Sequence, residues 1–217
     1  MKKLQLIIIT IITTIISLIM ILCTYFGITR YLILRFHSSD NYIENYHKLP
    51  KSDSKKVVVV IHSTPDKINT IRPMINSILD QTIRVDRIFL TVSTKNNYKL
   101  SEYLEKVVTL LPMGKNYGEG FVNSLVPILM HEKDCNTAIV ALADNIIYGK
   151  DFLETILNLS EKTPKTVIID KGKKSILIKP EYYDCNILNR DNDKYTEDWF
   201  LTKCPYKSIN YNENYKY

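Results

Sequence analysis

The fold of this chain is decided by the stretch Ala138-Ile139-Val140-Ala141-Leu142-Ala143-Asp144-Asn145. Its first six residues carry no charge, which is typical of a strand buried on both faces. Two polar residues end the strand, and in an open α/β sheet ligands bind just outside the carboxyl ends of strands. Asp144 is therefore a candidate ligand for a divalent metal on a phosphate-bearing substrate. The alternative is a simple turn formed by Asp144 and Asn145.

Strands and helices alternate on both sides of this stretch. Mostly apolar runs predict further strands at 57–61, 87–92, 108–111, 166–169 and 175–178. Apolar residues at helical spacing predict helices at 68–79, 100–107, 121–130 and 150–159. Pro73 lies inside the first helical pattern and marks the start of that helix. The alternation predicts an α/β, Rossmann-like fold with a mostly parallel sheet flanked by helices.

The N-terminal segment, residues 4–29, contains no charged residue and is longer than the roughly 20 residues that span a bilayer. A cleaved signal peptide is the alternative, but its apolar core is about 7–15 residues long and ends in small residues. The chain has Cys23-Thr24-Tyr25-Phe26 there instead. We therefore expect one transmembrane helix, an uncleaved signal anchor, after a short tail at 1–3.

The segment 30–55 is polar and shows no sustained periodicity, so it is predicted to be a stem or linker before a globular domain at 56–217. Lys2 and Lys3 on one side of the apolar segment compete with Arg30 and Arg35 on the other. Retention of the short tail in the cytosol would make this a single-pass membrane protein with a lumenal or extracellular domain. The opposite orientation stays open.

The composition excludes some classes of protein. With 45% hydrophobic and 24% charged residues, the chain is close to an average globular protein. Its net charge is +6, but the basic residues are scattered and no nucleic-acid-binding motif occurs, so nucleic acid is not expected as a partner. No cysteine spacing predicts zinc. Cys185 and Cys204 either pair in an oxidising compartment or remain free thiols.

Two segments of the chain have features that occur together in a known family. The first is Ser77-Ile78-Leu79-Asp80-Gln81-Thr82, a helix end that is followed by a polar turn and the strand Val85-Asp86-Arg87-Ile88-Phe89-Leu90. The second is the stretch 138–153, in which a buried strand leads to Asp144, a tyrosine (Tyr148) and a helix that begins with an aromatic residue (Phe152). Together they resemble family-2-like glycosyltransferases with the GT-A fold, whose corresponding strand leads to an Asp-x-Asp motif. The resemblance covers about residues 56–207.

The resemblance implies a hexosyltransferase-type enzyme that moves a sugar from a nucleotide-sugar donor to a glycan, lipid or protein acceptor. In such enzymes the acidic motif holds Mn²⁺ or Mg²⁺, which bridges the donor diphosphate. Asp144, with Asn145, would be the metal ligand. The first loop receives the nucleotide, which makes His62, Thr64 and Asp66 candidates for donor contacts.

The segment around Glu197 and Asp198 resembles the acidic pair that supplies the catalytic base in inverting members. The base must reach the acceptor hydroxyl to take its proton. Asp198 is the first candidate and Glu197 the second. The alternative is that both residues favour a helix N-terminus through its dipole.

The chain also departs from the family. Relatives carry three acidic residues where this chain has Ala143-Asp144-Asn145, and an Asn oxygen can ligate a cation but brings no charge. The loop 115–120 resembles an Asp-Tyr-Gly-Pro loop that has lost its Asp and Pro. Two other hypotheses therefore stand beside the enzyme: a catalytically inactive GT-A-fold protein that serves as a membrane-tethered binding or structural module, and an unrelated α/β membrane protein.

Overall fold

The computed structural model describes residues 2–52, 55–68, 70–93, 99–113, 121–170, 172, 174–183 and 207–211. Its strands are β1 (Val57–His62), β2 (Arg87–Ser93), β3 (Thr109–Met113), β4 (Ala138–Leu142), β5 (Thr166–Asp170), β6 (Ser175–Ile178) and β7 (Lys207–Tyr211). Its helices are α1 (Lys2–Tyr25), α2 (Ile28–Phe36), α3 (Ser39–Lys48), α4 (Arg72–Leu79), α5 (Glu102–Val107), α6 (Val122–His131), α7 (Phe152–Lys162) and the short 3₁₀ helix η1 (Pro180–Tyr182).

The strands form one sheet in the order β3-β2-β1-β4-β6-β5-β7. All neighbouring strands are parallel except at β6, which runs antiparallel to both β4 and β5. The predicted α/β fold with a mostly parallel sheet flanked by helices is confirmed. Each of the predicted strands and helices of the globular part is present, with ends shifted by at most a few residues. The first helix starts at Arg72, next to Pro73, as expected.

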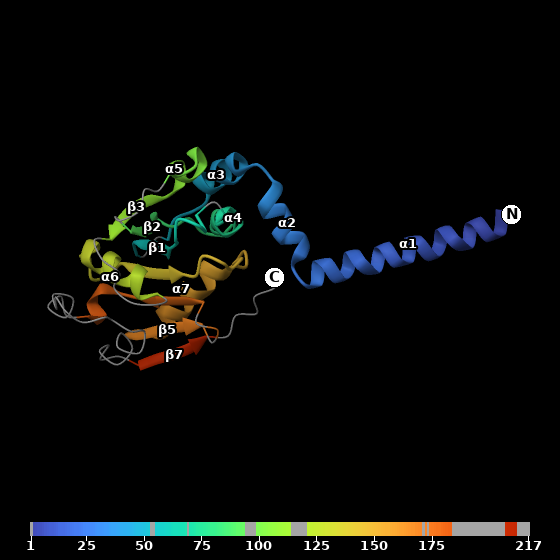
Figure 1. The fold of residues 1–217 in the computed structure, drawn as a ribbon. Helices are drawn as coiled ribbons and strands as arrows, with labels where there is room; N and C mark the ends of the chain where they lie inside the picture. Colours follow the sequence, from blue (N-terminus) through green and yellow to red (C-terminus); the bar gives the residue numbers. More distant parts are fainter. Residues whose placement is uncertain are drawn as a thin grey trace.

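Helices cover both faces of the sheet, which explains why the central strands β1 and β4 contain no Asp, Glu, Lys or Arg. Val57, Val59 and Ile61 of β1 pack on one face, in a core that includes residues of α4 and α7. Val58 and Val60 pack on the opposite face, in a core that includes residues of α6. Figure 1 shows α4 and α6 on opposite sides of the strands. Since side chains alternate along a strand, a strand between two helical layers must be apolar at every position.

The path of the chain creates a switch point in the sheet. From β1 the chain moves outward to β2 and β3, and then it returns to the other side of β1 as β4. The connections that follow β1 and β4 therefore leave in opposite directions along the sheet. This divergence opens a crevice at the carboxyl ends of these two strands, where ligands of open α/β sheets bind.

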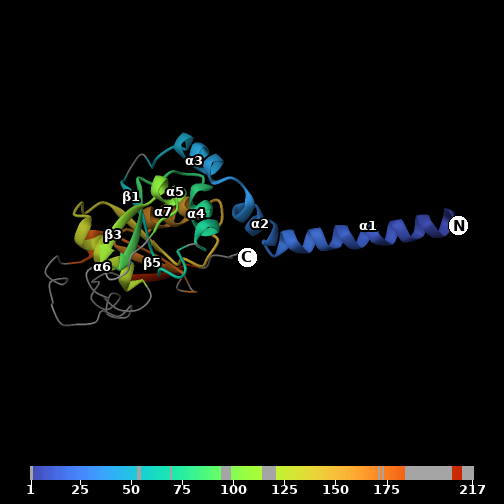
Figure 2. The same ribbon diagram turned by 45° about the horizontal axis from the view of Figure 1, so that its top comes forward.

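The N-terminal helix α1 extends away from the globular part and none of it is buried (Figures 1 and 2). Within the described residues, Lys3–Tyr25 is a helix long and apolar enough to cross a membrane, a property that signal sequences near an N-terminus share. The helix ends four residues before the predicted boundary. Gly27 adopts a left-handed conformation (φ 74°), which breaks the helix and starts α2.

The segment 30–55 differs from the expected linker because it contains α2 and α3, which pack against α4. Leu34 and Tyr46 are buried. The Tyr46 hydroxyl donates to the Val85 carbonyl (3.2 Å) and accepts from the Val85 N–H (3.0 Å). These helices bury only a few side chains each, so their sequence lacks the regular apolar stripe by which a helix is recognised.

Candidate functional site

The loops that follow β1 and β4 are joined by a hydrogen bond at the switch point. Ile61 and Leu142 are register partners, so both loops begin at the same level of the sheet. The buried Ser63 donates from Oγ to Asp144 Oδ2 over 3.1 Å. The carboxylate of Asp144 is half-buried, and it is held in place from the neighbouring loop. This contact places Asp144 where the fold is expected to bind a ligand.

A cavity of about 240 Å³ lies beside this contact. Three parts of the chain line it: the loop after β1, the first turn of α6 and the end of β4. The lining residues that matter for its chemistry are His62, Ser63, Thr64, Lys67, Ser124 and Asp144. The cavity therefore brings together one carboxylate, one ammonium group, one imidazole and three hydroxyl groups.

The wall formed by α6 suits an anion. Unpaired backbone N–H groups give the first turn of a helix a partial positive charge, which attracts phosphate. Ser124 is 1% exposed, and its Oγ has no hydrogen-bond partner among the described residues. Lys67 adds a full positive charge to the same cavity. A buried hydroxyl without a partner is costly, so a ligand oxygen that pairs with Ser124 would be stabilised.

His62 is held as a neutral imidazole with a defined tautomer. The Thr91 hydroxyl donates its one proton to the Ile61 carbonyl (3.2 Å). The same oxygen lies 3.1 Å from His62 Nδ1, and it can only accept a hydrogen bond there. Nδ1 therefore carries the proton, and Nε2 is left as an acceptor. Burial lowers the pKa of His62, and a hydrogen bond with the Thr91 backbone and, to a smaller extent, the negative charge of Asp144 oppose this effect only in part. His62 lines the smaller cavity as a neutral group.

Thr64 and Asp66 have different positions. The Thr64 carbonyl accepts from the N–H groups of Lys67 and Ile68 (both 3.0 Å), which shapes the loop, and Thr64 lines the cavity. Asp66 is exposed and lines neither of the two cavities described here. A side-chain hydrogen bond with Thr64 lowers the pKa of Asp66. The structure thus assigns Asp66 to the turn, and brings His62 and Thr64 to the cavity.

A second cavity, of about 350 Å³, lies on the other side of Asp144. Its walls come from α2, from the start of α4 and from the loop after β4. The apolar residues that line it are Ile28, Tyr31, Ile71, Pro73, Met74 and Ile147. Lys67 and Asp144 line both cavities, so the two spaces meet at these two side chains.

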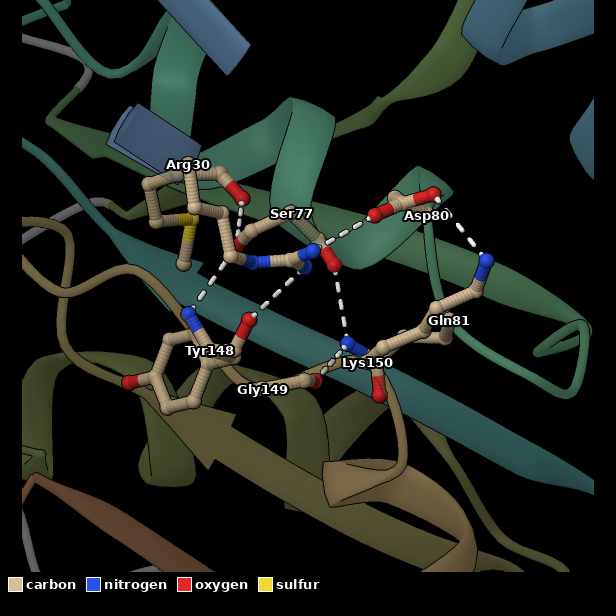
Figure 3. A network of polar contacts seen from close by, with 8 residues as sticks. Arg30, Ser77, Asp80, Gln81, Tyr148, Gly149 and Lys150 are labelled. Carbon is tan, nitrogen blue, oxygen red and sulfur yellow. Dashed lines mark hydrogen bonds and ion pairs between the residues drawn. The ribbon is translucent and has the colours of Figure 1, made fainter. Parts of the chain in front are cut away.

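The loop that carries Asp144 is fastened to the end of α4, as Figure 3 shows. Ser77 Oγ accepts from the Tyr148 N–H (3.2 Å). The Gln81 side chain donates to the Gly149 carbonyl and accepts from the Leu153 N–H (2.9 Å). The family-like helix end that contains Ser77 and Gln81 is therefore a clamp on the loop after Asp144. This physical role was not evident from the sequence, where these residues only marked a helix terminus.

Arg30 of α2 joins the same network (Figure 3). Its NH1 group lies 2.8 Å from Asp80 Oδ2, and its NH2 group donates to the Tyr148 carbonyl over 3.2 Å. Lys150 lies 3.9 Å from the other oxygen of Asp80. The segment that follows α1 is thus tied directly to the loop of the candidate site.

The donor set does not form a metal centre by itself. Among the described residues there is no group of three His, Cys, Asp or Glu side chains that could hold an ion. Asp144 supplies one carboxylate, and Asn145 is exposed. Mg²⁺ sites of this kind use one or two carboxylates together with substrate phosphates and water. The residues therefore fit an ion that arrives with a diphosphate.

Several predicted site residues lie outside the described part of the chain. They are Asp198 and Glu197, the candidates for the base; the loop 115–120 and the two cysteines Cys185 and Cys204 lie outside it as well. Ser63, Lys67, Ser124 and Arg30 were missed by the sequence analysis. Ser63 and Lys67 follow the first predicted strand, but no pattern distinguishes them from the other polar residues there.

No family model matches the chain, and no curated protein matches it either. Among solved structures, the chain is similar to a proposed nucleotide-diphospho-sugar transferase from Desulfovibrio desulfuricans, with a TM-score of 0.47 and 9% sequence identity. The match covers 73% of this chain and 80% of the other. A likeness at this level carries no argument about activity, so the site is interpreted from its own geometry.

Proposed function

We propose that this chain is a membrane-tethered glycosyltransferase that binds a nucleotide-sugar donor in the cavity of about 240 Å³. The observation that carries the proposal is the hydrogen bond between Ser63 and Asp144 across the switch point, beside the first turn of α6. It combines a fixed carboxylate with a wall that favours anions. That pairing suits a diphosphate with a bound cation.

Each side chain of the cavity has a role in this proposal. Ser124 and Lys67 pair with diphosphate oxygens. Neutral His62 and Thr64 contact the nucleoside part of the donor. Asp144, with the Asn145 oxygen from the adjoining larger cavity, would hold Mn²⁺ or Mg²⁺ beside the diphosphate. When bound, this ion supplies positive charge that offsets the charge developing on the departing diphosphate.

The transfer itself exchanges one bond for another at the anomeric carbon. An acceptor oxygen forms a bond to that carbon as the bond from the carbon to the diphosphate oxygen breaks. The bonding electron pair leaves with the nucleoside diphosphate. A carboxylate takes the proton of the acceptor hydroxyl. On the basis of the family resemblance, we assign this last role to Asp198, with Glu197 as the second candidate.

A binding titration tests the donor site. The full chain in detergent micelles is titrated with uridine diphosphate and guanosine diphosphate, with and without Mn²⁺. We expect binding of one nucleotide that tightens on the order of tenfold or more with Mn²⁺, since a charge-assisted contact contributes about 1.5–3 kcal/mol. Absence of binding at millimolar nucleotide would sink the proposal.

The variant Asp144→Ala sharpens the test. It should remove the Mn²⁺-dependent part of the binding and leave the circular dichroism spectrum unchanged. Asp151→Ala is the matched control, because Asp151 is an exposed carboxylate seven residues further along that makes no side-chain cap and lines neither cavity. If Asp144→Ala unfolds the chain, Asp144 is a turn residue rather than a ligand.

A second function is favoured by the residues on either side of Asp144. Ala143 and Asn145 leave a single carboxylate, and the described residues hold no three-ligand cluster. A catalytically inactive protein with this fold could serve as a membrane-tethered binding or structural module. It would bind a nucleoside diphosphate, but it would not cleave a nucleotide sugar. Incubation with uridine diphosphate glucose and guanosine diphosphate mannose, followed by measurement of free nucleoside diphosphate, separates the two functions.

A further inference from the structure

The larger cavity shares Lys67 and Asp144 with the donor cavity, and its apolar part has no role in donor binding. We propose that this cavity of about 350 Å³ is the acceptor site and that it takes a membrane lipid with one apolar chain and a small polar head. This inference rests on the proposed function and names the acceptor class for the same site. A glycan and a protein are the acceptors that it excludes.

The lining of the cavity gives it a polar and an apolar part. Lys67 and Asp144 mark the point where it meets the donor cavity. Ile28, Ile71 and Met74 are among the apolar residues that line the remainder. The polar residues Thr70 and Asn145 line the cavity as well. A glycan that filled the apolar part would place hydroxyl groups against Ile28, Ile71 and Met74 without hydrogen-bond partners, which is unfavourable. A lipid instead places its head at Lys67 and Asp144, and its chain on the apolar wall.

The helix α2, which supplies one wall, also exposes apolar side chains outside the cavity. Leu32, Ile33 and Phe36 are 46%, 53% and 75% exposed. Figure 1 shows α2 directly after α1, and the break between the two helices is at Gly27. Exposed apolar residues therefore run from α1 into α2. Exposed apolar residues on a helix next to a membrane span are typical of helices that lie at the bilayer surface. One wall of the cavity is therefore at the membrane.

Side-chain contacts hold α2 on the globular part. Arg30 is paired with Asp80 over 2.8 Å, and Asn76 Nδ2 donates to the Leu34 carbonyl over 2.7 Å. Arg72 of α4 adds a hydrogen bond to Ser39, at the start of α3 (2.8 Å). The position of the cavity relative to α1 is thus set by packed contacts. A lipid can enter from the bilayer while most of its chain remains there.

The volume of the cavity agrees with a small part of a large lipid. Ligand sites usually enclose about 300–1,000 Å³, so about 350 Å³ is near the lower limit. This space holds a head group and the beginning of a chain. The rest of the chain stays in the bilayer.

Photolabelling tests the assignment. The full chain is reconstituted in phosphatidylcholine nanodiscs with dodecyl phosphate that carries a diazirine in its chain. We expect labelled peptides from α2 and from the start of α4. Unlabelled dodecyl phosphate should compete, and inorganic phosphate should not. Equal competition by inorganic phosphate, or by maltose or a soluble peptide, would overturn the assignment to a lipid.

A pair of variants makes the test specific. Ile147→Trp fills the larger cavity and leaves the residues of the donor cavity unchanged. It should reduce labelling about fivefold or more, because the tryptophan side chain would take the space that the lipid needs. Leu110→Trp, at an exposed position on β3 that lines neither cavity, should label like the wild type.

Nucleotide binding distinguishes a missing lipid site from a missing donor site. Nucleoside diphosphate binding is measured on the same nanodiscs. If the wild type binds nucleotide but is not labelled, or if Ile147→Trp is labelled as strongly as the wild type, the lipid site is wrong and the donor site stands. If the wild type binds no nucleotide, both fall.

Discussion

At the scale of single residues, His62 offers a test of how the donor cavity is built. Burial lowers its pKa below the ordinary value of about 6.5, so the folded chain binds the proton less well than the unfolded chain does. Folding stability should therefore fall as the pH drops from about 7 to about 5. The variant His62→Asn has a side-chain amide that can still donate to Thr91. In this variant, the decrease in the free energy of unfolding that His62 causes at low pH should disappear. Urea unfolding at a series of pH values measures it.

The same substitution at His37, an exposed residue outside the site, controls for the removal of a histidine. His37→Asn should keep the wild-type pH dependence of unfolding. If His62→Asn and the wild type give parallel curves of stability against pH, the imidazole is not kept neutral by burial. The assigned role of Nε2 as an acceptor would then lose its basis.

Single-residue patterns predicted only part of the site. Asp144 was predicted because it ends a buried strand, and His62 and Thr64 because the family resemblance implies donor contacts in the first loop. Ser124 was not predicted, because its unpaired hydroxyl matters only where α6 approaches the end of β4. Asp66 was included by its position in the loop, and its exposure removes it from the cavity. Proximity in the sequence locates a loop, and packing decides which of its side chains face a ligand.

At the scale of elements, the clamp between α4 and the loop after β4 gives a second prediction. Gln81 is 1% exposed, and its side chain pairs with the Gly149 carbonyl and the Leu153 N–H. Gln81→Ala should leave the Leu153 N–H unpaired, at about 1–3 kcal/mol, and should leave the Gly149 carbonyl with the Phe152 N–H as its donor (3.3 Å). The free energy of unfolding should fall accordingly, and nucleotide binding should weaken because the Asp144 loop is released. Urea unfolding and the nucleotide titration measure the two effects.

Asn158→Ala is the control for Gln81→Ala, because it removes an exposed side-chain amide from α7. It should change the unfolding free energy by no more than about 0.5 kcal/mol. Equal stability of the two variants would mean that the Gln81 bonds contribute nothing net. The family-like helix end would then be a coincidence of sequence.

The packing of α2 and α3 gives a third prediction. A chain that begins at Ile28 retains Leu34 and Tyr46, while one that begins at Lys55 loses both from the core. Each such side chain contributes about 1.5–3 kcal/mol on burial, and loss of Tyr46 also leaves the Val85 backbone groups unpaired. The shorter chain should melt at a clearly lower temperature. Equal melting temperatures would restore the interpretation of 30–55 as a linker.

The elements themselves were predictable where burial is complete. The strands of the sheet centre are apolar at every position because helices lie on both faces, and that pattern is visible in one sequence. The helices α2 and α3 were missed because each buries few side chains and α2 leaves apolar residues exposed. The edge strand β7 was missed for a related reason. It is paired on one side only, and Ile209 within it is 36% exposed.

At the scale of the whole molecule, the contacts of α2 hold the segment after α1 on the globular part. Arg30 links this segment to Asp80 and to the Tyr148 carbonyl. The apolar cavity and the exposed apolar residues of α2 lie in the same region. If α1 spans a membrane, as we propose, the candidate site faces one side of that membrane only. The orientation of α1 then decides which pool of donor and acceptor the site meets.

Cys135 is a native reporter of that orientation, because it is exposed and unpaired on the globular part. Lys2 and Lys3 on the short tail favour a cytosolic N-terminus, which places the globular part outside the cytosol. A membrane-impermeant maleimide added to intact cells should then label the wild type more than Cys135→Ser. The difference in labelling between the two proteins should be the same after the cells are permeabilised. If the difference appears only after permeabilisation, the globular part is cytosolic. The site would then draw on cytosolic nucleotide sugars and on the lipids of the inner surface.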